Sequence, residues 1–171
     1  MALTIENIAS SSDEELFALL GKELEHRISA PRDSPQFLEQ IRALPIGLRA
    51  MAATYELDVS LALDDLGWHF GNWHSMELAE ETARGLDELE AGELAELFRQ
   101  AFEIAKKYWN ELGSDCWMGW YHGSDFETLT EPLTEKAWSI LAGKKKGIFH
   151  YWVGYARHHP ERIGAVRGVS H

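Results

Sequence analysis

Three aspartates and two histidines stand on Tyr55–Ser75, the most apolar long run of the chain, and such side chains could carry acid–base or metal chemistry. Asp58, Asp65 and His69 are separated by seven and four residues, so on a continuous helix they share one face. An aspartate that orients a histidine could make it a base or a metal ligand. The alternative is a structural strip in which Asp65 and His69 pair as i, i+4 neighbours. The sequence therefore predicts a candidate polar site at Asp58, Asp65, His69 and His74.

A second set of chemistry-bearing residues is a dense series of carboxylates over residues 56–103. Thirteen acids stand there against Arg84 and Arg99, a net charge of −11 in a chain whose total is −12. Most of these acids fall on the polar faces of two predicted amphipathic helices, so we expect them to be exposed and to attract a basic surface. We call the predicted partner-binding residues the acidic array: Glu77, Glu80, Glu81, Asp87, Glu88, Glu90, Glu93 and Glu96.

Several classes of catalytic and cofactor site lack their sequence signatures. Cys116 is the only cysteine, so one chain can form neither a disulfide nor a thiolate metal cluster. A Gly-rich phosphate loop, a GxSxG elbow and an HExxH zinc helix are all missing from the sequence. His69 and His74 are five residues apart and point in different directions on a continuous helix. We therefore expect no catalytic residue, no metal and no cofactor.

The chain carries no signal of a membrane or secretory destination. No uninterrupted apolar run approaches the roughly 20 residues needed to cross a bilayer, and the first ten residues, MALTIENIAS, have neither a basic start nor an apolar core. The acidic middle of the chain also disfavours direct contact with nucleic acid, since phosphates would be repelled. We expect a cytoplasmic protein that binds neither membranes nor nucleic acids directly.

The elements that must position these residues are all predicted to be helices. With 171 residues the chain has the size of one domain, and apolar residues recur at helical period while strand-like alternation is missing. We predict a single all-α domain over 1–171, a helical bundle around a central, mostly buried helix at about residues 46–66. The ends, 1–11 and 164–171, are predicted to be loose. Residues 113–130 are predicted to form an aromatic-rich loop whose rings plug one end of the bundle; the alternative is an aromatic platform for a ring-bearing ligand or a protein partner.

Several segments of the chain together resemble a known family. They are YELDV at 55–59, DLGWHFGNWHS at 65–75, the acidic helix pair over 77–105, PLTEKAW at 132–138 and YARHHPERI at 155–163. In this pattern the chain resembles the bacterial DNA-mimic protein domain family, whose members are all-helical. The resemblance implies a non-enzymatic protein that offers carboxylates, in place of DNA phosphates, to a DNA-binding protein.

Three functional hypotheses follow from the sequence. The leading one is an acidic helical module that binds a protein partner with a basic surface, such as a DNA-binding protein, through the acidic array. The second is an inhibitor of the immunity or antitoxin type, specific for one toxin. The third is a small metal-dependent or acid–base hydrolase that uses the face of Asp58, Asp65 and His69. The sequence leaves a homodimer open.

Overall fold

The computed structural model describes residues 3–144 and 147–167, and within them all regular secondary structure is helical apart from one isolated bridge. The all-α prediction is confirmed. The elements, in chain order, are α1 (Ile5–Ser10), α2 (Asp13–Arg27), α3 (Pro35–Arg42), α4 (Ile46–Leu63), α5 (Leu66–Asn72), α6 (Met76–Glu88), α7 (Gly92–Lys107), α8 (Trp109–Leu112), α9 (Trp117–Tyr121), α10 (Asp125–Lys144), α11 (Phe149–His158) and the 3₁₀ helix η1 (Pro160–Ile163).

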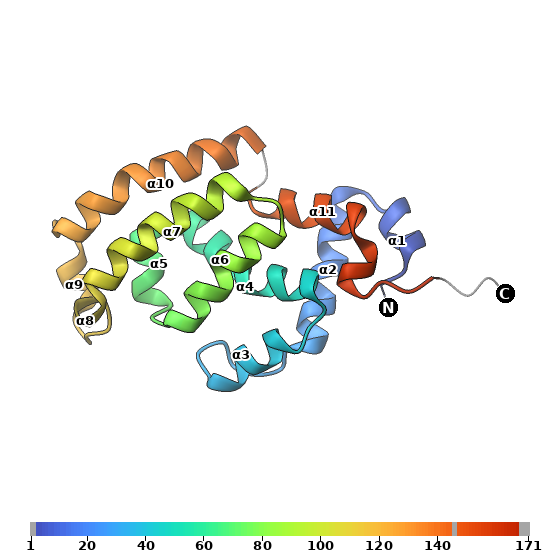
Figure 1. Ribbon diagram of the computed structural model, residues 1–171, viewed down its shortest axis with the longest axis horizontal. Helices are drawn as coiled ribbons and strands as arrows, with labels where there is room; N and C mark the ends of the chain where they lie inside the picture. The colour runs from blue at the N-terminus through green and yellow to red at the C-terminus, as the bar shows by residue number, and fades with distance from the viewer. Residues whose placement is uncertain (1–2, 145–146, 168–171) are drawn as a thin grey trace.

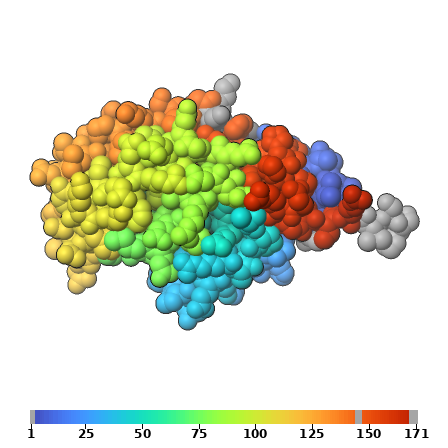
Figure 2. Space-filling model, in the orientation of Figure 1, coloured from blue at the N-terminus to red at the C-terminus, as the bar shows by residue number. Residues whose placement is uncertain are grey.

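The helices surround α4 in an elongated bundle (Figure 1). Helix α6 packs along α4, α7 packs between α6 and α10, and α5 fills the space between α4, α7 and α10. At the other end, α11 packs on α1, α2, α4 and η1. In the space-filling view (Figure 2) the surface of α6 and α7, green to yellow, lies between α10 at the top and α3 at the bottom. The helices that carry the acidic array therefore contribute to the face that Figure 2 shows.

Helix α4 is the predicted central helix, and eleven of its residues are buried. Gly85 of α6 brings the two backbones together, because a Cβ there would come within 2.9 Å of the Ala50 carbonyl oxygen. The helix begins at Ile46 as predicted, but it ends at Leu63 rather than near residue 66. The side chain of Asp65 accepts a hydrogen bond from the Trp68 backbone N–H and so caps a new helix, α5.

The two ends of the chain differ from the sequence prediction. Residues 1–11 and 164–171 were predicted to be loose, but Thr4 and Val166 form a parallel bridge and Leu3 is buried. Arg157 of α11 donates hydrogen bonds to the carbonyls of Ile8 and Ser11. The prediction is therefore wrong for residues 3–11 and 164–167, because the two ends satisfy each other's backbone groups; residues 1–2 and 168–171 lie outside the described residues.

The predicted loop over 113–130 is also more helical than expected. It contains α9, and α10 already starts at Asp125, so that Pro132 lies inside a 20-residue helix. Proline is usual in the first turn of a helix, since it cannot donate the i to i−4 hydrogen bond that the helix interior needs. Ser124 begins the helix instead, because its hydroxyl accepts a hydrogen bond from the Glu127 backbone N–H.

Candidate functional site

The predicted polar site does not form one face. Because the backbone breaks between α4 and α5, Asp58 and His69 stand on different helices and Asp65 lies at the junction. Asp58 accepts a hydrogen bond from the Ile148 backbone N–H at 2.9 Å, and burial raises the pKa of its carboxyl although this bond opposes the shift. Asp65 accepts hydrogen bonds from Trp68 N–H and from the Tyr121 hydroxyl. Both carboxylates are therefore used to join helices.

His69 is buried in the core and keeps its ring neutral. Its Nδ1 lies 2.9 Å from the hydroxyl oxygen of Ser60 on α4, and its ring contacts the rings of Phe70 and Phe98. Burial lowers the pKa of His69 to about 3, because this apolar site disfavours the imidazolium ion. A histidine with so low a pKa, enclosed by aromatic rings, fits a structural hydrogen bond between α4 and α5.

His74 lies outside α5 and is bound elsewhere. Its ring stacks on Trp109 with centroids 4.2 Å apart, and its Nε2 is 2.8 Å from the Trp109 carbonyl oxygen. Across the described part of the chain, no three His, Cys, Asp or Glu side chains come together in a way that could hold a metal ion. The four residues of the candidate polar site therefore bond to separate parts of the fold.

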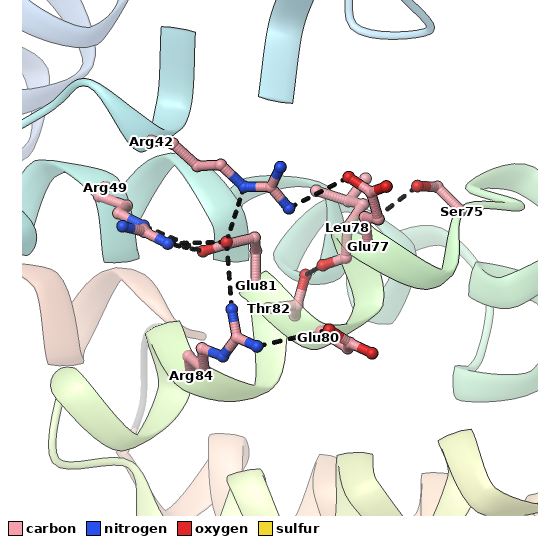
Figure 3. Close-up of polar contacts among 9 residues, drawn as sticks. All are labelled: Arg42, Arg49, Ser75, Glu77, Leu78, Glu80, Glu81, Thr82 and Arg84. Carbon is pink, nitrogen blue, oxygen red and sulfur yellow. Dashed lines mark hydrogen bonds and ion pairs between the residues drawn. The ribbon is translucent and has the colours of Figure 1, made fainter. Parts of the chain in front are cut away.

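Glu81, at the middle of the acidic array, is a buried structural residue. Its side chain is 2% exposed and accepts hydrogen bonds from three arginines (Figure 3). Arg49 donates through Nε at 3.0 Å and Nη2 at 2.7 Å, Arg42 through Nε at 3.1 Å, and Arg84 through Nη1 at 3.3 Å. Burial raises the pKa of Glu81, but the hydrogen bonds from Arg49 and Arg42 outweigh it and leave the pKa below its usual value of 4.5.

The same arginines neutralise the neighbours of Glu81. Arg42 reaches Glu77 at 3.1 Å and Arg84 reaches Glu80 at 3.4 Å, as Figure 3 shows. Both carboxylates are exposed, yet this part of the array contains three acids and three arginines. Its local net charge is zero. The expectation that all eight carboxylates face a partner is therefore wrong for Glu81, which is buried. Glu77 and Glu80 are exposed, but each is already paired with an arginine of the same chain.

The chain's own C-terminal region contacts two further acids of the array. Glu88 accepts a hydrogen bond from the Tyr155 hydroxyl and forms an ion pair with Arg162 at 2.8 Å, and its side chain is 19% exposed. Glu90 lies 3.2 Å from Nε2 of His159 but its side chain is 66% exposed. Glu88 therefore fixes α11 and η1 to α6, whereas Glu90 still presents its carboxylate to solvent.

The remaining acids lie where α6 turns into α7. Asp87 is half exposed and pairs with Arg99. Glu93 and Glu96 are exposed, and together with Lys136 they line a shallow hollow between α7 and α10. Among the described residues, neither carboxylate forms an ion pair with Lys136. We call Asp87, Glu90, Glu93 and Glu96 the acidic corner. All four carboxylates are exposed, and Glu93 and Glu96 form no ion pair within the described residues.

The aromatic residues of 113–130 plug one end of the bundle. Tyr121 and Phe126 are fully buried, and Trp68 of α5 contacts the rings of Trp117 and Tyr121. Desolvation and the hydrogen bond to Asp65 raise the pKa of Tyr121, so its hydroxyl stays protonated and donates. The packing interpretation of these rings is the one that their burial supports.

Comparisons with known proteins add no further assignment. Neither protein families, nor curated proteins, nor solved structures include one that matches this chain. Over the described residues, every helix is too short or too polar to pass through a lipid bilayer. The function therefore has to be argued from the chain's own residues.

Proposed function

We propose that this protein is a non-enzymatic, acidic helical module that binds a basic surface of a protein partner through the acidic corner. The observation that carries the proposal is the contrast within the array. Glu77, Glu80 and Glu81 are matched by three arginines, whereas Glu93 and Glu96 of the corner are exposed and form no ion pair within the described residues. An exposed concentration of one charge sign steers an oppositely charged partner and favours its binding.

The charge balance around the corner supports this choice of surface. From Asp87 to Glu96 the array has five acids, and its arginine partners are Arg99 and Arg162, which leaves three negative charges. Lys136 also lines the hollow and reduces the excess to two negative charges. A compact surface with this charge suits a patch of lysines and arginines, such as DNA-binding proteins carry.

The backbone at Glu90 also supports the proposal. Its φ of 61° makes it the only non-glycine residue with positive φ among the described residues. The Ala91 N–H bonds to the Leu86 carbonyl and the Glu90 N–H to the Asp87 carbonyl, which is the hydrogen-bond pattern of a helix end that favours glycine at this position. A glutamate in a conformation that costs about 1–2 kcal/mol fits a residue whose side chain has a role outside the fold.

The test is binding to purified basic DNA-binding proteins, measured by biolayer interferometry at about 50 and 200 mM salt. The Debye length, over which charges attract each other, shortens markedly across this range. We expect a complex that weakens with salt and is displaced by double-stranded DNA. The double variant Glu93→Lys/Glu96→Lys should abolish it. The control is Glu39→Lys/Glu111→Lys, which makes the same change in net charge at exposed positions on α3 and α8. Equal loss in both variants, or no complex with any such protein, would refute the proposal.

A further inference from the structure

A partly enclosed apolar cavity lies beside the central helix, on elements other than those of the acidic corner. It has a volume of about 400 Å³ and is formed by α2, the α2–α3 connection, α3, α4 and α11. Four aromatic rings line it, from Phe17, Phe37, Tyr55 and Trp152. Cavities of this size, walled by aromatic and aliphatic groups with a few polar side chains, are typical binding sites for small molecules.

One charged group of the cavity wall is held in a fixed position. The guanidinium of Arg32 lies over the Tyr55 ring, 4.3 Å from its centroid, and forms an ion pair through Nη1 with Glu56 of α4. The Glu56 side chain is 7% exposed, whereas that of Arg32 is 45% exposed. The buried carboxylate and the ring therefore orient the guanidinium, and within the described chain its Nε and Nη2 have no acceptor. A guanidinium held this way is suited to bind a carboxylate.

The helix that forms one wall of the cavity has a glycine where the fold does not need one. Gly21 lies in the interior of α2 and lines the cavity, and a Cβ built on it would meet nothing within 4 Å. Glycine weakens a helix interior relative to alanine. Packing in the folded protein does not account for Gly21, but a requirement for free space in the cavity does.

We propose that this cavity binds a small amphipathic anion, with an apolar body of alkyl or aromatic carbon and a single carboxylate. The body would lie against the rings of Trp152 and Phe17, which line the cavity and offer large apolar faces. The carboxylate would accept hydrogen bonds from Arg32.

The charges of the wall decide between an anion and a cation. Arg32 and Lys22 line the cavity with Glu25 as the acid, and Glu56, which pairs with Arg32, does not line it. Positive groups therefore predominate at the surface that a ligand would touch. An organic cation would also have to compete with Arg32 for the face of Tyr55. The proposed ligand site is independent of the acidic corner, and its test does not involve a protein partner.

The test is isothermal titration calorimetry of the full chain with two carboxylates, decanoate and indole-3-propionate. Decyltrimethylammonium and decanol serve as the cationic and neutral counterparts of decanoate. We expect saturable binding of at least one carboxylate, and binding of decanoate about tenfold or more tighter than of the cation or the alcohol. Absence of carboxylate binding up to millimolar concentration, or equal binding of the cation, would overturn the proposal.

Variants locate the binding. Gly21→Leu should fill the cavity and abolish binding, since leucine suits a helix and its side chain meets open space. Arg32→Gln should weaken carboxylate binding about tenfold or more while leaving decanol unchanged. The matched control is Arg27→Gln, which removes an arginine of α2 that pairs with Glu23 and does not line the cavity. Circular dichroism of each variant verifies folding, and binding that persists in a folded Gly21→Leu protein would sink the assignment.

Discussion

Replacement of Glu81 by glutamine removes one buried charge and little volume. The side chain is 2% exposed and holds Arg42, Arg49 and Arg84. Each arginine is itself a third or more exposed, so solvent screens each interaction. The bidentate geometry of Arg49 makes its ion pair with Glu81 the strongest of the three. We expect Glu81→Gln to lower the free energy of unfolding by about 2–3 kcal/mol.

Urea denaturation followed by far-UV circular dichroism measures this loss at pH 7, and thermal denaturation should show a fall in Tm of about 5–10 °C. The matched control is Glu80→Gln, on the same helix, because Glu80 is 56% exposed and its ion pair is with Arg84 alone among the described residues. This control should change the free energy of unfolding by less than about 0.5 kcal/mol. The comparison separates a structural carboxylate from a surface carboxylate on the same helix.

The pH dependence gives a second readout of the same prediction. The pKa of Glu81 lies below 4.5 in the folded protein, so its contribution is fully present above that pH and is lost as the pH falls through the folded pKa. The difference in stability between the wild type and Glu81→Gln should therefore shrink in acid. A variant as stable as the wild type at pH 7 would refute the reasoning, because it would mean that the three arginines do not need the carboxylate.

Two further predictions concern His69 and Glu90. Because the pKa of His69 is about 3 in the folded protein and 6.5 when exposed, the unfolded state binds a proton between these pH values that the folded state does not. The free energy of unfolding should therefore fall by about 2 kcal/mol between pH 7 and pH 5. In urea denaturation, His69→Gln should remove most of this pH dependence. Glu90→Gly should raise the free energy of unfolding by about 0.5–1 kcal/mol, since glycine adopts positive φ without strain; lower stability in the same assay would show that the contact with His159 outweighs the strain.

The helices were predictable where the chain itself contains the start and stop signals. Ser12 and Ser75 both accept a backbone hydrogen bond at the start of a helix, as their types and positions predict. The sequence did not predict the end of α4 at Leu63, because apolar residues keep their helical spacing through Leu66 and Phe70. The hydrophobic pattern therefore predicts one continuous helix. Asp65 was the local signal for the break, since aspartate is a strong helix N-cap.

The role of Glu81 could not be predicted from its neighbours in the sequence. Its arginine partners Arg42 and Arg49 come from 39 and 32 residues earlier in the chain, and Arg162, the partner of Glu88, follows 74 residues later. A count of charges within a segment treats such arginines as part of a different region. Only the packing of α3 and α4 on one side of α6, and of η1 at its end, brings the opposite charges together.

The acidic corner has one competing structural explanation, and its residues differ in how well that explanation fits. A carboxylate in the first turn of a helix interacts favourably with the positive end of the helix dipole, and Glu93 occupies the first turn of α7. This effect decays within one turn, so it does not account for Glu96. It does not account for Glu90 either, which precedes the helix in a strained conformation. Binding that depends on Glu96 and Glu90 more than on Glu93 is therefore the pattern that a partner surface predicts and helix stabilisation does not.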